Sequence, residues 1–363
     1  MRIGLAYNQR PDDVTWRGGG DGRVSSREPS EPADAFVEWD DPETIEAVGN
    51  ALGIFGDVVP LEAVDDFPTR LRDARVDFLF NMAEGVSGPS RESHVPAIAE
   101  FFGIPYLGSD PLTLALALHK GRAKETFVQR GVPTPGFLLI ETEADVASLN
   151  GAMRYPLFLK PVWEGSSKGI GEANHAPTLE VARERSRELL ATYRQPVLAE
   201  SYLPGDEFTA AILGNGSDAE VLPLIRYRFG ALPDGALPIM GYEAKWLWDQ
   251  PDSSLDVLEC PAQVPDGLAD RIRATALAAY HALGCRDWSR VDLRLDADGL
   301  PYVLEVNPLP GVMPDPGAHS CFPCAASVAG MSYDELIQAV TRIAWRRATG
   351  KELPAPTLAG ASR

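Results

Sequence analysis

The stretch from Ser289 to Asn307 constrains the fold most, because it predicts a β-hairpin whose two strands agree on which face is polar. The turn signal is Asp296-Ala-Asp-Gly299, and a loop there pairs Leu295 with Leu300, Leu293 with Tyr302 and Val291 with Leu304. Side chains alternate between faces along a strand. The apolar face then holds Val291, Leu293, Leu295, Leu300, Tyr302, Leu304 and Val306, and the polar face holds Arg290, Asp292, Arg294, Glu305 and Asn307. Agreement between the strands specifies the register.

The polar face of this hairpin has two interpretations. A half-buried hairpin commonly exposes its charges to water, and the hairpin taken alone fits that description. Alternatively, two acids and an amide offer the oxygen ligands that Mg²⁺ prefers beside substrate phosphates, and an adjacent arginine holds a developing negative charge. The irregular loop Asn307-Pro-Leu-Pro-Gly311, which begins where the polar face ends, favours the second interpretation.

The N-terminal part of the chain alternates strand and helix signals. Buried strands are expected at 2–7, 58–61 and 76–80, and Asp41-Pro42-Glu43 opens a helix between the first two. This alternation predicts a parallel α/β sheet. Residues 8–34, rich in Gly, Pro and charged residues, predict a long polar loop.

Charge restricts the partners. The chain has 33 basic and 52 acidic residues and a formal net charge of −19, so we expect neither nucleic acid nor an anionic membrane surface as a partner. Positive charge comes almost entirely from arginine. The only lysines are Lys120, Lys124, Lys160, Lys168, Lys245 and Lys351.

The cysteines and the N-terminus indicate a cytoplasmic protein. Four cysteines do not form a disulfide scaffold, and the N-terminus lacks the apolar core of a signal peptide. No apolar run approaches the roughly 20 residues of a membrane span. Cys321-Phe-Pro-Cys324 suggests packing, redox chemistry or half of a metal site, and the lack of a second Cys-x-x-Cys favours packing.

Two loops are suited to a nucleotide. Lys160 ends a strand, and Gly165-Ser-Ser-Lys-Gly169 follows it, where glycine allows backbone N–H groups to approach phosphate oxygens. The loop matches neither a P-loop nor a dinucleotide fingerprint, and a plain surface turn is the alternative. Glu200 and Glu207 flank a turn and suit ribose hydroxyls, or else a solvated corner.

Together these pieces resemble the ATP-grasp superfamily, and most closely the D-alanine–D-alanine ligase family. Motifs in the family's order run from about Phe80 to Arg346. They are Phe80-Asn81 with Glu84-Gly85, Ser90-Arg-Glu-Ser93, Ile104-Pro-Tyr-Leu-Gly-Ser109, Leu116-Ala-Leu-His-Lys120, Leu159-Lys-Pro161 with Glu164-Gly-Ser-Ser167, Leu203-Pro-Gly-Asp-Glu207, Tyr242-Glu-Ala-Lys245, Arg290-Val-Asp292, Leu304-Glu-Val-Asn-Pro308, Pro310-Gly311 and Ala329-Gly-Met-Ser332. Each is modest, but their shared order makes a chance match very unlikely.

The resemblance implies an α/β (α+β) ATP-grasp fold of three domains, with the nucleotide held between the central and C-terminal domains. The implied domains are 1–109, a parallel α/β domain; 110–202, the central subdomain; and 203–350, the C-terminal subdomain, followed by a loose tail at 351–363. It also implies a homodimer.

The resemblance further implies a role for each site residue. ATP-binding residues would be Lys120, Lys160, Ser166, Ser167, Glu200, Leu203, Glu207 and Lys245, and Asp292, Glu305 and Asn307 would bind two Mg²⁺ ions, or Mn²⁺. Arg290 and the backbone N–H of Gly311 would stabilise an oxyanion, with Ser166 and Lys245 also taking part in catalysis. Glu84, Trp246 and Ser320 would contact the substrates.

The implied reaction is ATP-dependent joining of a carboxylate to an amine through an acyl phosphate. The family's N-terminal Gly-Gly-x-Ser-x-Glu is missing, Glu84 stands where histidine is usual, and Trp246 replaces a tyrosine. We therefore expect an amino-acid or carboxylate donor other than D-alanine. The alternatives are a housekeeping D-alanine–D-alanine ligase of cell-wall synthesis and a catalytically idle nucleotide-binding protein.

Overall fold

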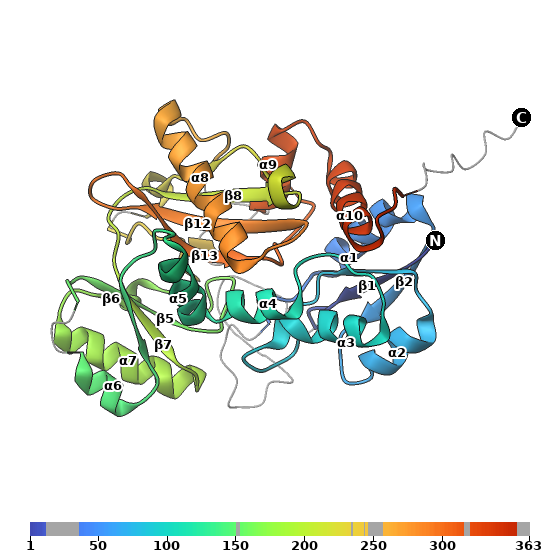
Figure 1. Ribbon diagram of the computed structural model, residues 1–363. Coiled ribbons are helices and arrows are strands. Elements are labelled where there is room, and N and C mark those ends of the chain that lie inside the picture. The colour runs from blue at the N-terminus through green and yellow to red at the C-terminus, as the bar shows by residue number, and fades with distance from the viewer. Residues whose placement is uncertain are drawn as a thin grey trace, which may run out of the picture.

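Three β-sheets organise the chain in a computed structural model that describes residues 1–11, 36–149, 153–233, 235–242, 244–245, 257–315 and 320–353. Figure 1 shows them as separate groups, with the first sheet on the right and the other two stacked on the left. Each sheet lies within one of the three predicted domain ranges, and the domain boundaries themselves remain a prediction. Most of the predicted 8–34 loop lies outside the described residues.

The N-terminal sheet is parallel, as its alternation of strand and helix predicts. Its order is β2–β1–β3, with β1 at Arg2–Tyr7, β2 at Asp57–Glu62 and β3 at Phe78–Asn81. The helices of this part are α1 (Pro42–Leu52), α2 (Phe67–Ala74) and α3 (His94–Phe102). Proline in the first turn of α1 fixes a helical φ where no N–H is needed. The carboxyl ends of β1 and β3 open toward the centre of the molecule, where ligands of such sheets bind.

The central sheet is antiparallel, in the order β4–β7–β5–β6. Its strands are β4 (Phe137–Ile140), β5 (Leu157–Pro161), β6 (His175–Ala176) and β7 (Val197–Ser201), and its helices are α6 (Glu143–Ser148) and α7 (Leu179–Tyr193). Both helices lie together on one side of this sheet (Figure 1). The apolar residues of α7 pack on those of β5 and β7 in one core.

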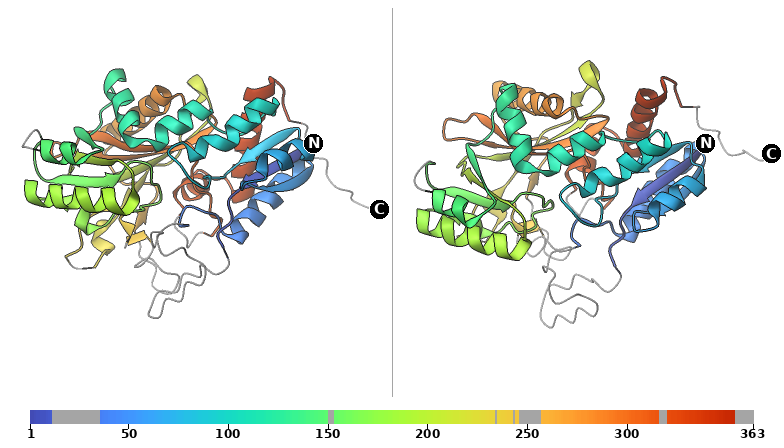
Figure 2. Two further views of the ribbon diagram at one scale, coloured as in Figure 1. Left: turned by 90° about the horizontal axis from the view of Figure 1, so that it is seen from below. Right: turned by 60° about the horizontal axis from the view of Figure 1, so that its bottom comes forward.

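The C-terminal sheet has the order β11–β10–β8–β12–β13, and β9 pairs with β8. Its strands are β8 (Glu207–Leu213), β9 (Glu220–Val221), β10 (Ile225–Tyr227), β11 (Leu258–Glu259), β12 (Trp288–Leu295) and β13 (Pro301–Asn307). One face packs on α5 (Lys120–Arg130) and α8 (Asp266–Leu283). Helix α4 (Pro111–Leu118) links this part to the N-terminal sheet, as the two views of Figure 2 also show.

The predicted hairpin exists, but its predicted register is wrong. Val291 pairs with Val306 and Leu293 with Val303, so Leu304 is an extra residue in a β-bulge. Simple alternation cannot anticipate a bulge. The extra residue moves the earlier residues of β13, 301–303, to the face opposite the predicted one. Val303 therefore enters the core, whereas Leu300 is exposed. The polar face keeps its predicted members, because Arg290 pairs with Asn307 and Asp292 with Glu305.

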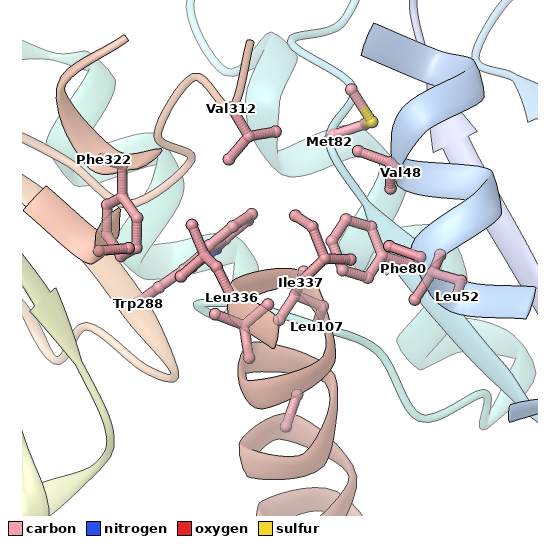
Figure 3. Close-up of a cluster of buried hydrophobic side chains, with 14 of the residues drawn as sticks. Val48, Leu52, Phe80, Met82, Leu107, Trp288, Val312, Phe322, Leu336 and Ile337 are labelled. Atoms are coloured by element: carbon pink, nitrogen blue, oxygen red, sulfur yellow. The ribbon is translucent and has the colours of Figure 1, made fainter. Parts of the chain in front are cut away.

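A shared core joins the N-terminal sheet to the C-terminal sheet and to the last two helices, α9 (Cys321–Val328) and α10 (Tyr333–Thr349). Figure 3 shows Trp288 of β12 at its centre, with Phe80 of β3 and Phe322 of α9 close by. The Trp288 ring meets both phenyl rings edge to face, at centroid distances of 5.9 and 5.7 Å. Leu336 and Ile337 of α10 complete the contact with α1. The end of the chain therefore packs on its beginning.

Asp287, fully buried just before β12, ties these parts together. Its carboxylate accepts hydrogen bonds from the Gly108 N–H (2.8 Å), from Asn215 Nδ2 (2.9 Å) and from Arg347 of α10 (2.8 Å from both Nε and Nη2). Arg347 also donates to the Tyr106 carbonyl at 2.7 Å. One carboxylate thus holds three distant segments.

Asp287→Ala should lower the free energy of unfolding by about 3–5 kcal/mol, because it leaves Arg347 without its partner inside the protein. The matched control is Asp270→Ala, which removes an exposed carboxylate on α8 that only pairs with Arg273. Urea denaturation followed by circular dichroism measures both variants. Equal midpoints for the two variants would contradict the structural role of Asp287.

Candidate active site

One pocket is lined from all three parts of the chain, and every described residue of the predicted site faces it. These residues are Glu84, Lys120, Lys160, Ser166, Ser167, Glu200, Leu203, Glu207, Lys245, Arg290, Asp292, Glu305, Asn307, Gly311 and Ser320. Trp246 lies outside the described residues. The predictions concerned residues spread along more than two hundred positions, and folding brings them to one place.

The polar face of the hairpin forms one wall. Asn307 Nδ2 donates to Asp292 Oδ2 at 3.0 Å, and Thr209 of β8 donates to Asp292 Oδ1. Arg290 holds the same carboxylate through Nε (3.1 Å) and Nη2 (2.9 Å). Because Asp292 pairs with Glu305 and Arg290 with Asn307, the three predicted metal ligands share one surface. The interpretation of this face as solvent-exposed is wrong, since it faces the pocket.

Lysines meet this wall from the other side. Lys120, at the start of α5, pairs with Glu305 at 3.1 Å and also donates to the Glu164 carbonyl. Burial alone would raise the pKa of Glu305, but the charges of Lys120, Lys160 and Arg290 hold it at about 2. Glu305 is therefore ionised at neutral pH.

Glu200 lies between two buried lysines. Its carboxylate pairs with Lys160 Nζ at 2.5 Å and with Lys124 Nζ at 2.9 Å. Lys124 is completely buried on α5 and also donates to Thr134 at 2.8 Å. Burial lowers the pKa of Lys124 to about 8, although Glu200 opposes the shift. Glu200 thus supplies the counter-charge for both buried lysines.

The glycine–serine loop after β5 is held in an unusual conformation. Ser166 and Ser167 have φ angles of 47° and 63°, which cost energy for residues with a side chain. Ser167 Oγ donates to the Met240 carbonyl at 2.8 Å, and the Gly165 N–H donates to Glu38 at 2.8 Å. At Gly169 a Cβ atom would lie 2.7 Å from Pro161, so this position requires glycine. Strain of this kind is typical of loops that bind ligands.

The floor between the central and C-terminal sheets holds Glu207. Arg294 pairs with it at 2.9 Å and also donates to the Tyr202 hydroxyl at 3.1 Å. Burial raises the pKa of Glu207 to about 7 despite this arginine. Leu203 lies on the same side. An apolar side chain beside a carboxylate matches the predicted base and ribose end of a nucleotide.

The pocket is also lined by Lys245, Gly311 and Ser320. Ser320 Oγ donates to the Gly311 carbonyl at 3.2 Å, which ties the residue before α9 to the segment that follows β13. Burial lowers the pKa of Lys245, and nearby Arg290 acts in the same direction. Cys321 meets the Tyr227 hydroxyl at 3.3 Å within the shared core.

The N-terminal wall contains carboxylates that the sequence analysis missed. Glu38, Asp40 and Glu92 line the pocket together with Glu84. Burial raises the pKa of Glu92 to about 7 and the pKa values of Glu84 and Asp40 well above their usual range. In the sequence, only the predicted parallel sheet indicated this wall. The segments that follow β1 and β3 meet at the carboxyl edge of that sheet, where ligands bind. Lys124 had a clearer signal, being a rare lysine one helical turn after Lys120.

The donor set fits a nucleotide triphosphate with a divalent cation. Two buried lysines and a strained loop rich in N–H groups suit phosphates, and two carboxylates and an amide oxygen suit Mg²⁺. Among the described residues, no three His, Cys, Asp or Glu side chains lie close enough to hold a metal ion by themselves. Phosphate oxygens would have to supply further ligands, as is usual for Mg²⁺.

Comparison with known proteins gives the family. A family model described as D-ala D-ala ligase C-terminus matches residues 127–342, more than half of the chain. A D-alanine–D-alanine ligase of Azoarcus sp. is 35% identical over 270 residues, 74% of this chain and 81% of the relative. An uncharacterized protein, y4sG, of Sinorhizobium fredii is 37% identical over 273 residues, 75% of this chain and 76% of the relative. The chain belongs to the D-alanine–D-alanine ligase family.

Solved structures agree on the fold of this ligase. The D-alanine–D-alanine ligase of Bacillus anthracis complexed with ATP has a TM-score of 0.69 and 21% identity, and the match covers 96% of this chain and 99% of that one. VanG D-Ala:D-Ser ligase of Enterococcus faecalis has a TM-score of 0.65 and 20% identity, with 94% and 99% covered. The predicted family, ATP-grasp fold and enzyme class are confirmed: the chain is an ATP-dependent ligase that forms C–N bonds. In the described part of this ligase, every helix is too short or too polar to cross a membrane.

Glu200→Gln should destabilise the nucleotide-free ligase by about 3–5 kcal/mol, because it leaves two buried lysines without their shared counter-charge. The control is Glu143→Gln, which breaks an exposed ion pair with Arg187 and should leave the melting temperature unchanged. Differential scanning calorimetry of both variants tests this. A Glu200→Gln protein as stable as the control would show that Glu200 is dispensable for the fold.

Glu92→Gln should stabilise the ligase at about pH 8 and change little at about pH 5. A carboxyl group with a raised pKa favours folding while it is protonated, and this contribution is lost as pH rises from its ordinary pKa through about 7. Glutamine stays neutral at every pH, so the variant does not lose stability at this position as the pH rises. The melting temperatures of the variant and the wild type, measured at both pH values, should therefore diverge with rising pH. A constant difference would contradict the raised pKa.

Proposed function

We propose that the ligase uses ATP to activate the carboxylate of one amino acid or other carboxylate and joins it to the amine of a second amino acid. The observation that carries the proposal is the grouping of Asp292, Glu305 and Asn307 on one pocket wall, facing Lys120 and Lys160. The donor carboxylate attacks the γ-phosphorus and ADP leaves. The amine, once it has lost a proton, attacks the acyl carbon of the acyl phosphate, and inorganic phosphate leaves.

The lysines hold the nucleotide phosphates in this proposal. A lysine presents a compact charge that needs no planar partner. Lys120 and Lys160 lie deep in the pocket and are oriented by Glu305 and Glu200, so they are in place before the nucleotide binds. Ser166 and Ser167 would cover the phosphates from the strained loop. Glu207 and Leu203 would hold the ribose and the base.

The hairpin end serves the metal and the reacting carbonyl. Asp292, Glu305 and Asn307 would hold Mg²⁺ or Mn²⁺, which supplies neutralisation of the transferring phosphoryl group. The ion pair with Asp292 fixes the direction of the Arg290 guanidinium. Arg290 and the Gly311 N–H would stabilise the oxyanion formed when the amine attacks, and Lys245 would approach the γ-phosphate.

The substrates need not be two D-alanines. The departures at Glu84 and Trp246, and the missing N-terminal glutamate motif, concern substrate contacts, whereas the nucleotide and metal positions keep the family's residues. Glu84 and Ser320 line the pocket beside the catalytic wall and are our candidates for substrate contacts. A homodimer and a cytoplasmic location remain predictions from the resemblance and the sequence.

Glu305→Gln should reduce ADP release by at least about a hundredfold, because it removes a charged ligand where phosphoryl transfer takes place. The assay measures ADP release with MgATP across a panel of amino acids of both chiralities. Calorimetric binding of ATP without metal separates loss of chemistry from loss of folding. Exposed Glu46→Gln on α1 is the control. Unchanged ADP release in Glu305→Gln would refute the metal assignment.

A further inference from the structure

The N-terminal wall of the pocket carries more carboxylates than the described side chains pair with. Five carboxylates of this wall line the pocket: Glu38, Asp40, Asp41, Glu84 and Glu92. Two are paired. Glu38 accepts from Arg91 at 2.8 Å and lies 3.5 Å from Lys168, and Asp41 pairs with Arg10 at 3.1 Å.

The other three have no hydrogen-bond or ion-pair partner among the described side chains. Glu92 is 91% buried, since its exposed fraction is 9%, and it faces the pocket without any such contact. Oδ2 of Asp40 is inaccessible to solvent and accepts no hydrogen bond. Glu84 likewise lines the pocket without a partner. Backbone bonds fix the place of Asp40, which bridges to Gln9 beyond the end of β1.

Unpaired carboxylates in a buried wall are costly. Burial raises the pKa values of all three, and neighbouring carboxylates add to the shift, although Arg10 opposes it at Asp40 and Arg91 opposes it at Glu84 and Glu92. A further cation placed among them would reduce the repulsion and favour their ionised forms. The wall therefore has the electrostatics of a cation-binding site.

Among the described residues, these carboxylates do not form a group of three with metal-binding spacing. Cations bound here would therefore lie at separate points, which fits an organic ligand with more than one charged group better than a single metal ion. The α-ammonium group of an amino acid would neutralise one of the three carboxylates. Two would remain, which a single ammonium group does not satisfy.

The place of Glu92 indicates which substrate carries the extra charge. Its electrostatic neighbours include Lys120 and Glu305, at the end of the pocket where phosphoryl transfer is proposed. A ligand held by Glu92, Glu84 and Asp40 would thus lie near the place proposed for phosphoryl transfer, beside the activated carboxylate.

We propose that the carboxylate-donating substrate is a basic amino acid, with a second cationic nitrogen on its side chain that Glu92 and its two unpaired neighbours bind. This inference rests on the proposed ligase function and specifies its donor. The donor then brings one carboxylate to the lysine side of the pocket and two cations to the acidic wall. A neutral amino acid would leave most of the wall unpaired.

The test supplies hydroxylamine as a general amine, so that the acceptor need not be known. Full-length ligase with MgATP is given ornithine or lysine, of either chirality, and the hydroxamate and ADP are measured. The neutral isosteres norvaline and norleucine, and D-alanine, are compared at the same concentrations. A kcat/KM at least about tenfold higher for the basic acids is expected, which corresponds to one extra ion pair.

Variants link this preference to the wall. Glu92→Gln and Glu84→Gln should reduce the preference for ornithine over norvaline or lysine over norleucine, mainly through KM of the donor, while KM for ATP stays within twofold. Glu46→Gln, an exposed substitution on α1, should keep the preference. A preference that survives both wall substitutions would overturn the assignment.

The outcomes separate this inference from the proposed function. Best turnover with D-alanine or another neutral acid would overturn the inference and leave the ligase function standing. Absence of ADP with every donor would overturn the function.

In that case, calorimetry with a non-hydrolysable ATP analogue and Mg²⁺ decides the inference. Tighter binding of the basic acid than of its isostere, lost in Glu92→Gln, supports the inference, and equal binding of the two overturns it. Putrescine that binds as tightly as ornithine would also overturn it, because the site would then recognise a diamine without a carboxylate.

Discussion

The structure depends on one buried carboxylate. Asp287 accepts hydrogen bonds from Gly108, Asn215 and Arg347, so it connects the N-terminal part, the C-terminal sheet and the last helix at one point. Its φ of 66° is unfavourable for a residue other than glycine, and these contacts hold it there. The residue that follows, Trp288, fills the core that the same three parts share. Asp287 thus joins the three parts by hydrogen bonds, and Trp288, the next residue, joins them by apolar packing.

This constraint sets the direction of the catalytic wall. Strand β12 starts at Trp288, and Arg290 and Asp292 follow at alternate positions, so they lie on the same face as Trp288. Because Trp288 is fixed against Phe80 and Phe322, the polar residues cannot rotate away from the pocket. The N-terminal acidic wall is carried by the same anchored part, since Gly108 is bound to Asp287 and Phe80 lies four residues before Glu84. The catalytic wall and the acidic wall, which a substrate must bridge, are therefore both held in position by Asp287 and Trp288.

Much of this arrangement could be predicted from the sequence, and what could not has identifiable causes. The parallel N-terminal sheet and the membership of the hairpin's polar face follow from local periodicity, and the structure has both. The register required knowledge of the bulge at Leu304, which alternation alone does not reveal. Strand β4 and helix α6 were not predicted, because both are short and marginal in pattern. Asp287 and Glu200 look like ordinary acids in the sequence, and only long-range contacts reveal that the first is a hub and that the second bridges Lys124 and Lys160.

Charge is distributed unevenly within the pocket, and that asymmetry carries chemical information. At the nucleotide end, Lys120 pairs with Glu305, and Lys160 and Lys124 share Glu200, so each lysine has a counter-charge before an anion arrives. Binding a polyphosphate there adds negative charge, which a divalent cation must offset. At the N-terminal wall, the carboxylates outnumber the cationic side chains that pair with them in the described part of the chain. Bound phosphate makes the neighbourhood of Glu92 more negative still, because Lys120 is then shared with the nucleotide. A cationic donor would relieve that repulsion, so nucleotide and donor should favour each other's binding. The coupling is reciprocal by thermodynamic necessity, and it would reserve the activated state for a substrate able to neutralise the wall.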